Sequence, residues 1–433
     1  MKYIISTLGC KVNQYETQAM ETFLMERGHE RAVPGETADA VIVNTCAVTA
    51  ESGRKSRQVI RRLRDENPGA LLAVCGCYSQ IEPEEAAAIG ADVIFGAAER
   101  EKLVDAIEQA YADRVKRVEI DKPFERRVFE RLPAGAAEHR TRAMLKIQDG
   151  CVNFCTYCII PYTRGRLRSL PLADAAEETR RLAAEGFREI VLTGIEVASY
   201  GVDLPGRPGL ADVIETVAAA GPELRIRLSS LEPTVITEDF CRRLAATGRV
   251  CRHFHLSLQS GCDRTLKAMN RKYDTRTFFE KTELLRTSFP GCALTGDLIT
   301  GFPGETEEDQ AETLAFLEKC GFADLHIFPY SRRPGTPADK MPGQCTRAVK
   351  ERRAREAQAV MEKLRRAYRE GCVGRTLPVL FETEDEGFCT GHSDTYMSVT
   401  AAGTGLRGRV LDVRITAADA DGLRGELLLP ARE

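Results

Sequence analysis

Three cysteines lie close together in the stretch DGCVNFCTYCIIPYTRGRLR, at residues 149–168. Cys151, Cys155 and Cys158 have the spacing C-x3-C-x2-C, and no fourth cysteine follows nearby. Thiolates are the usual ligands of iron–sulfur clusters, which normally take four of them. Three would hold a [4Fe–4S] cluster with one iron open to a non-protein ligand, much as a catalytic zinc site keeps one position open. Zinc or three inert buried thiols are the alternatives, but zinc loops usually pair two C-x2-C units, so the spacing favours an iron–sulfur cluster.

A second set of cysteines is spread over the N-terminal part of the chain. Cys10, Cys46 and the pair Cys75 and Cys77 follow short apolar runs, in STLGCKVNQYE, VIVNTCAVT and LLAVCGCYSQ. In a parallel sheet the carboxyl ends of the strands share one edge, where ligands gather. The pattern predicts that these thiols are neighbours in space, although cysteines at strand ends can also be inert core residues.

The elements that must position these cysteines can be read from hydrophobic periodicity. Residues 1–112 alternate short apolar runs with helical stretches, which predicts a small parallel α/β domain. Residues 113–141 are charged and lack a sustained period, so we expect a linker. Six strand-like runs, each followed by a helical stretch, begin at residues 143, 189, 225, 253, 293 and 324. They predict a partial (β/α)6 barrel over 142–370, with its site at the carboxyl ends of the strands. That range ends in a charged helix over 346–370, and the Gly-rich runs of 371–433 predict a small β-barrel.

The bulk composition restricts the function classes. The chain has 433 residues, with 61 Lys and Arg against 64 Asp and Glu, so its net charge of −3 does not point to a nucleic-acid partner. The N-terminal stretch MKYIISTLGCKVNQ resembles neither a signal peptide nor a membrane span, and we expect a cytoplasmic protein with no membrane partner. Fifteen cysteines in a reducing compartment suggest metal ligation rather than disulfides. The scattered histidines are assigned no metal.

The C-x3-C-x2-C loop resembles that of the radical S-adenosylmethionine enzymes. The strings GCKxNxxE, NTCxVT and GCxxQ resemble the N-terminal domain of the methylthiotransferases, which join it to a radical S-adenosylmethionine barrel and a C-terminal TRAM β-barrel. This resemblance covers essentially the whole chain. It implies S-adenosylmethionine on the open iron of the Cys151/Cys155/Cys158 cluster, and a second [4Fe–4S] cluster on Cys10, Cys46 and Cys77, with Cys75 left as a non-ligating thiol.

The same resemblance suggests which strand ends contact S-adenosylmethionine. The expected contacts are Gly194, Glu196, Ser229, Gln259 and Asp297. Because the cofactor supplies the radical chemistry, no side chain is assigned as a catalytic acid or base.

The strings GCKVNQYET, CTYCIIPYTRGRLRS and FPYSRRPGTPA are most similar to the branch that acts on threonylcarbamoyladenosine in tRNA. That branch inserts sulfur at carbon 2 of the adenosine next to the anticodon and methylates it. It implies two S-adenosylmethionines per product, one for the radical and one as methyl donor, with a low-potential electron donor and a sulfur source. Isopentenyladenosine in tRNA and an aspartate of a ribosomal protein are the other substrates within the family. A rival of another class is an RNA-binding redox or cluster-carrier protein.

An RNA partner requires local basic surfaces. A helix through residues 54–64 would place several arginines within one arc, opposite Val59, Ile60 and Leu63. We expect tRNA contacts from Arg54, Arg57, Arg61, Arg64, Arg164 and Arg166. A solvated helix face beside an acidic partner helix is the alternative. Residues 371–433 hold six basic and ten acidic side chains, so a TRAM barrel would need a local patch such as Arg407, Arg409 and Arg414.

Overall fold

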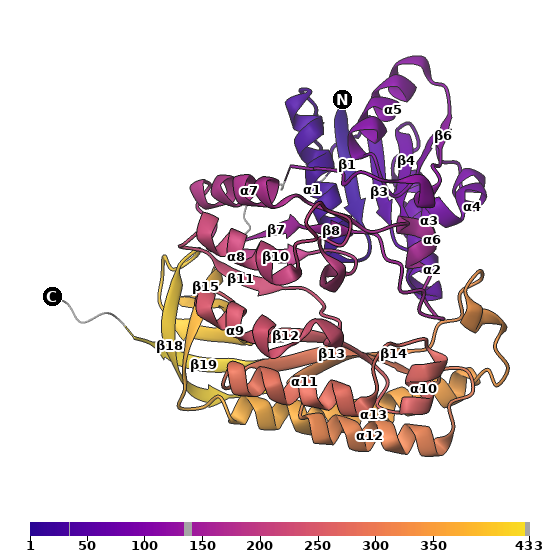
Figure 1. The fold of residues 1–433 in the computed structure, drawn as a ribbon. Coiled ribbons are helices and arrows are strands. Elements are labelled where there is room, and N and C mark those ends of the chain that lie inside the picture. Colours follow the sequence, from indigo (N-terminus) through magenta and orange to yellow (C-terminus); the bar gives the residue numbers. More distant parts are fainter. Residues whose placement is uncertain (34, 134–140, 429–433) are drawn as a thin grey trace.

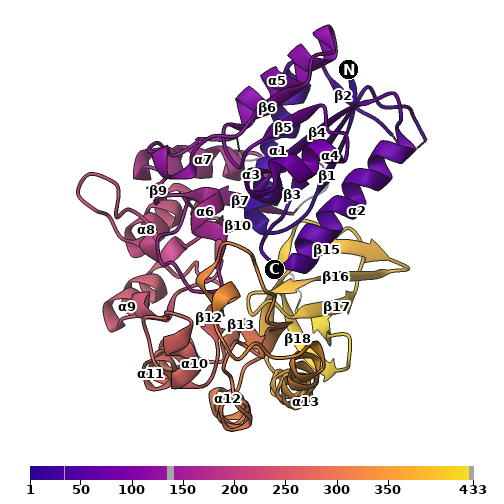
Figure 2. The same ribbon diagram turned by 90° about the vertical axis from the view of Figure 1, so that its right-hand side faces the viewer.

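The computed structural model describes residues 1–33, 35–133 and 141–428. The chain forms an N-terminal α/β domain, a central open barrel and a closed C-terminal β-barrel, coloured indigo, magenta to orange, and yellow (Figures 1 and 2). Part of the expected linker, 134–140, and the last residues of the expected C-terminal barrel, 429–433, lie outside the described residues.

The N-terminal domain is built on a parallel six-stranded sheet in the order β2-β1-β3-β4-β5-β6. Every residue of β3 and β4 is buried because helices cover both faces of the sheet. Met20 of α1 and Leu103 of α5 belong to the core on one face, and Ile60 of α2 to the core on the other. The strands are Lys2–Thr7, Glu30–Arg31, Ala40–Thr45, Leu71–Gly76, Val93–Phe95 and Arg117–Glu119, and the helices α1 to α5 are Lys11–Glu26, Ala50–Glu66, Cys77–Ile81, Pro83–Ala88 and Arg100–Asp113.

Residues 113–141, expected to be a linker, contribute to this domain. Their segment Arg117–Glu119 is strand β6 and pairs with β5. Farther along, Arg126 donates hydrogen bonds to Asp121 and to the Gln80 side chain of α3. Local periodicity could not reveal β6, because a three-residue edge strand is too short to show one. The remaining domain limits stay predictions.

The central domain contains the six expected strands, all parallel within their sheets. They form two three-stranded sheets, β11-β10-β7 and β12-β13-β14, which the isolated bridges Ile226↔Val250 and Leu231↔Leu256 connect. The strands are β7 Arg142–Lys146, β10 Glu189–Thr193, β11 Arg225–Leu228, β12 His253–Gln259, β13 Ala293–Thr300 and β14 Asp324–Pro329; β8 Gln148–Asp149 and β9 Arg168–Ser169 form a small hairpin beside them. The helices are α6 Ile160–Arg164, α7 Leu172–Ala184, α8 Leu210–Ala220, α9 Glu238–Thr247, α10 Asp263–Ala268, α11 Thr275–Ser288 and α12 Glu307–Cys320.

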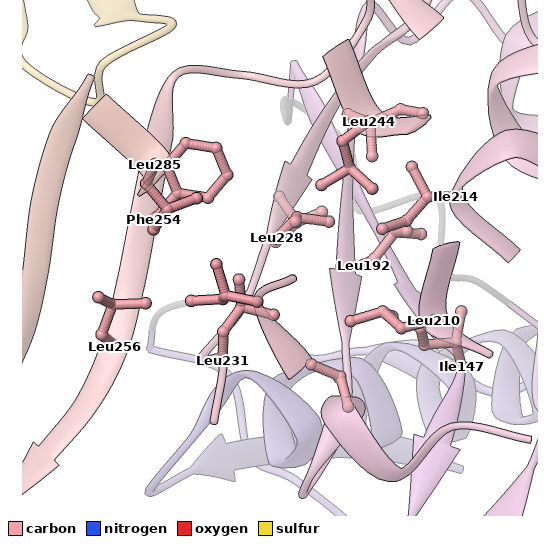
Figure 3. Packing of buried hydrophobic residues seen from close by; sticks show 14 of the residues in the cluster. Ile147, Leu192, Leu210, Ile214, Leu228, Leu231, Leu244, Phe254, Leu256 and Leu285 are labelled. Carbon is pink, nitrogen blue, oxygen red and sulfur yellow. The ribbon is translucent and has the colours of Figure 1, made fainter. Parts of the chain in front are cut away.

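The two faces of β7, β10 and β11 differ in chemistry. Successive residues of a strand point to opposite faces. Leu192 and Leu228 are paired in register and pack with Ile214 between the strands and their covering helices, as Figure 3 shows. The opposite face, toward the barrel interior, carries Arg142, Met144, Lys146, Glu189, Val191, Arg225 and Arg227. The barrel therefore has an apolar jacket around a charged interior.

The C-terminal barrel follows a long helix. The expected helix is α13, Arg347–Glu370, which packs on α12 and β14. The barrel closes in the order β15-β16-β17-β19-β18 around a core of its own. Its strands are Thr376–Asp385, Phe388–Ser393, Ser398–Ala402, Leu423–Leu427 (β19) and Val410–Ala418 (β18). No described helix is long and apolar enough to cross a membrane.

The C-terminal barrel docks on the amino ends of the central strands through arginines. Arg225 donates to the carbonyl of Pro378 (3.1 Å) and Arg227 to that of Asp394 (3.0 Å). Both guanidinium groups also bind the fully buried carboxylate of Glu189, at 2.5 Å and 2.7 Å. Burial alone would raise the pKa of Glu189, but Arg227 and Arg225 outweigh it and lower the pKa to about 2.

We predict that Glu189→Gln lowers the free energy of unfolding by about 3–5 kcal/mol, because two buried arginines lose their charged partner. Since the pKa of Glu189 is lowered on folding, its stabilisation is present above the unfolded pKa of about 4.3 and is lost as the pH falls toward 2. Urea denaturation at pH 7 and pH 3 measures both effects. Exposed Glu223→Gln is the control; an E189Q protein as stable as this control would contradict the prediction.

Candidate active site

The loop with Cys151, Cys155 and Cys158 begins at the carboxyl end of the β7–β8 segment. Its backbone is tightly turned: Gly150 has φ +77°, and a Cβ atom there would collide with the carbonyl of Arg166. The three thiols lie near one another, since Cys155 and Cys151 both raise the pKa of Cys158 electrostatically. Burial raises the pKa of Cys151 and of Cys158 to about 12. Metal binding must therefore displace thiol protons, as is usual for cysteine ligands.

The N-terminal cysteines also meet. Cys10 is influenced electrostatically by Cys77 and Cys46, and Cys46 by Cys77. Burial raises the pKa of Cys46, and desolvation by the surrounding protein raises that of Cys10 to about 11 although Cys10 reaches the surface. A Cβ atom on Gly9 would lie 3.0 Å from the Sγ of Cys46, so the loop before Cys10 needs glycine.

Cys75 and Cys77 occupy different environments. Cys75, within strand β4, belongs to the hydrophobic core under α1 and α5. Cys77 begins α3 after Gly76, whose φ of +100° turns the chain, and it packs on the other side of the sheet. That Cys77, rather than Cys75, joins Cys10 and Cys46 as a ligand stays a prediction.

One buried ion cluster connects the two cysteine sites. The Glu16 carboxylate of α1 contacts Arg100 (3.1 Å), Lys146 (3.2 Å) and Arg164. Lys146 also binds Asp149 at 2.7 Å, two residues before Cys151. Burial raises the pKa of Glu16, but its three cationic neighbours outweigh this and hold the pKa at about 2. Helix α1, which follows Cys10, is thereby held against the residues on both sides of the loop that carries Cys151, Cys155 and Cys158.

The expected RNA contact of Arg164 is wrong in this structure. Its side chain is 0% exposed and donates to Glu16 and to the Oδ1 atom of Asn13 (2.9 Å). A buried carboxylate needs cationic partners, and this requirement places the arginine inside the molecule. Arg166 is exposed, as expected.

The expected contacts of α2 are only partly available to a partner. Arg54 and Arg61 are exposed, together with Lys55 and Arg62, and Arg54 is paired with Glu51. Arg57 is half-buried between Glu85 (3.2 Å) and the Tyr78 ring. Arg64 donates to the carbonyls of Ala70 and Gly90 and to Asp92, so this side chain serves the domain's own structure. Helix α2 begins beside the loop after β14, where the Ala50 amide donates to the Ser331 hydroxyl (Figure 1).

The five expected cofactor contacts lie on β10 to β13 or just after them. Ser229 is nearly buried, and its hydroxyl has no hydrogen-bond partner among the described residues. A Cβ on Gly194 would lie 2.9 Å from the Gln148 carbonyl, so glycine permits close approach to the cysteine strand. Gln259 has a φ of +65° at the end of β12.

Two of these side chains already have partners. Glu196 accepts from the Ala198 amide and the Ser199 hydroxyl, which caps the short helix Val197–Ser199, and burial raises the pKa of Glu196. Asp297 lies 3.2 Å from the ring of His255 in the barrel interior.

Sequence reasoning missed Arg271, which borders the loop that carries Cys151, Cys155 and Cys158. It donates to the Sγ atom of Cys155 (3.2 Å) and to Glu232 (2.6 Å). It also missed the ring contacts that Phe154 makes with Phe124 and Tyr162, within the loop and beside it. No spacing or composition signal marks these residues, because only the fold brings their elements together.

The residues fit iron–sulfur clusters in donor chemistry. Each site offers three soft thiols, and the free Ser229 hydroxyl lies at a neighbouring strand end. Among the described residues, no three Cys, His, Asp or Glu side chains converge as ligands of one metal ion. A [4Fe–4S] cluster differs from such an ion because its ligands bind different irons, which lie apart.

Comparisons with known proteins agree with this geometry. A model of the radical SAM superfamily matches residues 145–317, and one of the uncharacterized protein family UPF0004 matches residues 2–96. The radical S-adenosylmethionine methyltransferase TsrM from Kitasatospora setae has a similar fold, with a TM-score of 0.57 and 16% identity over 89% of this chain and 79% of that one. The central domain is thus a radical S-adenosylmethionine domain, which defines the chain's class as the radical S-adenosylmethionine enzymes.

Two curated relatives align over almost the whole chain. The threonylcarbamoyladenosine tRNA methylthiotransferase MtaB of Bacillus subtilis is 40% identical over 95% of this chain and 93% of its own. The tRNA-2-methylthio-N(6)-dimethylallyladenosine synthase of Sphingopyxis alaskensis is 37% identical over 98% and 97%. The chain therefore belongs to the radical S-adenosylmethionine tRNA methylthiotransferases, a family that uses S-adenosylmethionine and two [4Fe–4S] clusters.

We predict that Arg164→Met lowers the free energy of unfolding by about 3–5 kcal/mol, because Glu16 loses one of its charged partners in the interior. Arg166→Met is the matched control, since its exposed side chain should change stability by no more than about 0.5 kcal/mol. Urea denaturation of both variants tests this. Equal stability of R164M and R166M would show that the ion cluster does not hold the two domains together.

Proposed function

We propose that this protein replaces the hydrogen at carbon 2 of N6-threonylcarbamoyladenosine, next to the anticodon of tRNA, with a methylthio group. The observation that carries the proposal is the pair of three-thiol sites joined through the Glu16 ion cluster. The relative named for threonylcarbamoyladenosine supports this substrate at 40% identity. The relative named for dimethylallyladenosine, at 37% identity, makes that nucleoside the second candidate.

In this proposal, Cys151, Cys155 and Cys158 hold the cluster that binds S-adenosylmethionine. Cys10, Cys46 and Cys77 hold the cluster that carries the inserted sulfur. When bound, S-adenosylmethionine and its cluster supply radical chemistry that side chains cannot perform. The methyl group would come from a second S-adenosylmethionine, and a low-potential electron donor and a sulfur source complete the reaction.

The protein's own residues position the cofactor and the nucleoside. Gly194 lets the strand end after β10 pack closely on Gln148, before the Cys151 loop, and offers its backbone groups to the cofactor, while the free Ser229 hydroxyl offers it a hydrogen bond. Gln259 and Asp297 extend this surface over the neighbouring strands, and Glu196 keeps the loop after β10 in shape through its cap. No side chain acts as a general acid or base.

The tRNA backbone would contact the exposed cations of α2. Arg54, Lys55, Arg61 and Arg62 form a basic surface on a helix that begins beside the β14 loop. Such cations bind phosphates without reading sequence. Arg166, which is exposed after the loop with Cys151, Cys155 and Cys158, would contact phosphates from the central domain.

Mass spectrometry of tRNA nucleosides tests the substrate directly. Cells that lack the protein should lose the methylthio form of threonylcarbamoyladenosine, and the purified, anaerobically reconstituted enzyme should restore it on their tRNA. Loss of the methylthio form of isopentenyladenosine instead would establish the second candidate. Normal levels of both nucleosides would contradict either activity.

The cysteine assignment predicts different iron contents for two neighbouring variants. The reconstituted wild type should hold about eight irons per chain, because each of its two clusters contains four. We expect Cys77→Ala to hold about four, because one cluster is lost, and Cys75→Ala to remain near eight. Iron analysis and the visible absorption of both proteins measure this. The reverse order of the two variants would make Cys75 the ligand.

A further inference from the structure

A cavity of about 250 Å³ lies where the three domains meet. Lys11 of α1, Arg142 and Met144 of β7, Arg227 of β11, and Glu382 and Tyr396 of the C-terminal barrel line it. None of these side chains belongs to the cysteine sites or to the cofactor contacts proposed above. The cavity is therefore available for another part of a bound molecule.

The wall of the cavity is the inner face of the half-barrel. Met144, Val191 and Arg227 occupy paired positions across β7, β10 and β11, so they share one face, and Arg142 precedes Met144 by two residues on that face. Met144 and Val191 give this wall an apolar strip, and the two arginines flank it with positive charge. Such a surface suits a ligand that is flat and apolar in one part and anionic in another.

The charges around the cavity do not balance. Glu382 binds Arg142 at 2.9 Å, and Glu189 behind the wall binds Arg227 at 2.7 Å. Within the described parts of the chain, the exposed Lys11 side chain has no carboxylate within 4 Å of its ammonium group and makes no hydrogen bond. Of the three cations that line the cavity, Arg142 and Arg227 are paired with carboxylates, and Lys11 is the one left for an incoming anion.

The cavity adjoins the N-terminal cysteine site through one residue. Lys11 directly follows Cys10, one of the three thiols of that site. For its substituent to enter the cavity, a nucleoside that receives sulfur there must lie with its N6 edge toward Lys11. The group at N6 of threonylcarbamoyladenosine ends in a carboxylate, whereas the dimethylallyl group of the second candidate is apolar.

We infer that this cavity binds the N6 side group of the modified adenosine, with Lys11 holding its carboxylate. The inference rests on the proposed function and names the residues that select the substrate. Burying an apolar dimethylallyl group against the Lys11 ammonium group would desolvate that charge without compensation, so the same residue disfavours that nucleoside. The C-terminal barrel takes part because it supplies Glu382 and Tyr396.

Two anticodon stem-loop RNAs test this, one with threonylcarbamoyladenosine and one with its carboxyl group as the methyl ester. The reconstituted enzyme should bind the ester about 10- to 100-fold more weakly, since a hydrogen bond to a charged group is lost. Lys11→Met should weaken binding of the acid by a similar factor and show no further loss with the ester. Fluorescence anisotropy under anaerobic conditions gives the dissociation constants, and exposed Lys102→Met is the matched control.

The outcomes separate the two proposals. If the wild type methylthiolates the acid RNA but binds acid and ester equally, the cavity assignment is overturned and the proposed function stands. If the wild type fails to convert the acid RNA at all, both are overturned. Because the ester changes only the ligand, it decides the question even where K11M loses iron.

Discussion

The buried carboxylate of Glu16 is the interaction on which the arrangement of the site depends. A charge without exposure is tolerated only when cations surround it, and Arg100, Lys146 and Arg164 do so from three separate elements. The helix that carries Glu16 starts directly after Cys10, while Lys146 and Arg164 lie on either side of the loop with Cys151, Cys155 and Cys158. Two sites from different domains therefore share one electrostatic anchor, which fixes their separation more firmly than a flexible linker could.

Much of the architecture could be predicted because its signals are local. The six central strands, helix α13 and the closed C-terminal barrel follow from hydrophobic periodicity, and they occur where the sequence indicates them. The spacing of Cys151, Cys155 and Cys158 could likewise be interpreted without a fold. What could not be predicted depends on partners distant in the chain: β6 exists because β5 offers an edge, and Arg164 is buried because Glu16 is.

The choice between Cys75 and Cys77 shows the same limit at single-residue scale. The two cysteines are separated by one glycine, and spacing and periodicity do not reveal which of them faces the other thiols, so only the family resemblance favours Cys77. The left-handed turn at Gly76 ends the strand between them, so one thiol stays in the core and the other begins a new helix. Charged residues within the strands, such as Arg142 and Arg227, are similarly ambiguous in sequence. Alternation alone does not show whether they face solvent or a polar barrel interior.

The position of the C-terminal barrel determines its role in the enzyme. Small appended domains of this kind are often regarded as exchangeable modules that bind a substrate from outside. Here Glu382 and Tyr396 form one wall of an internal cavity, and the arginines opposite bind the backbone carbonyls of the same barrel. Exchange of this barrel with one from a related chain would consequently alter the interior of the enzyme, so the two domains are expected to diverge in sequence together rather than as independent modules.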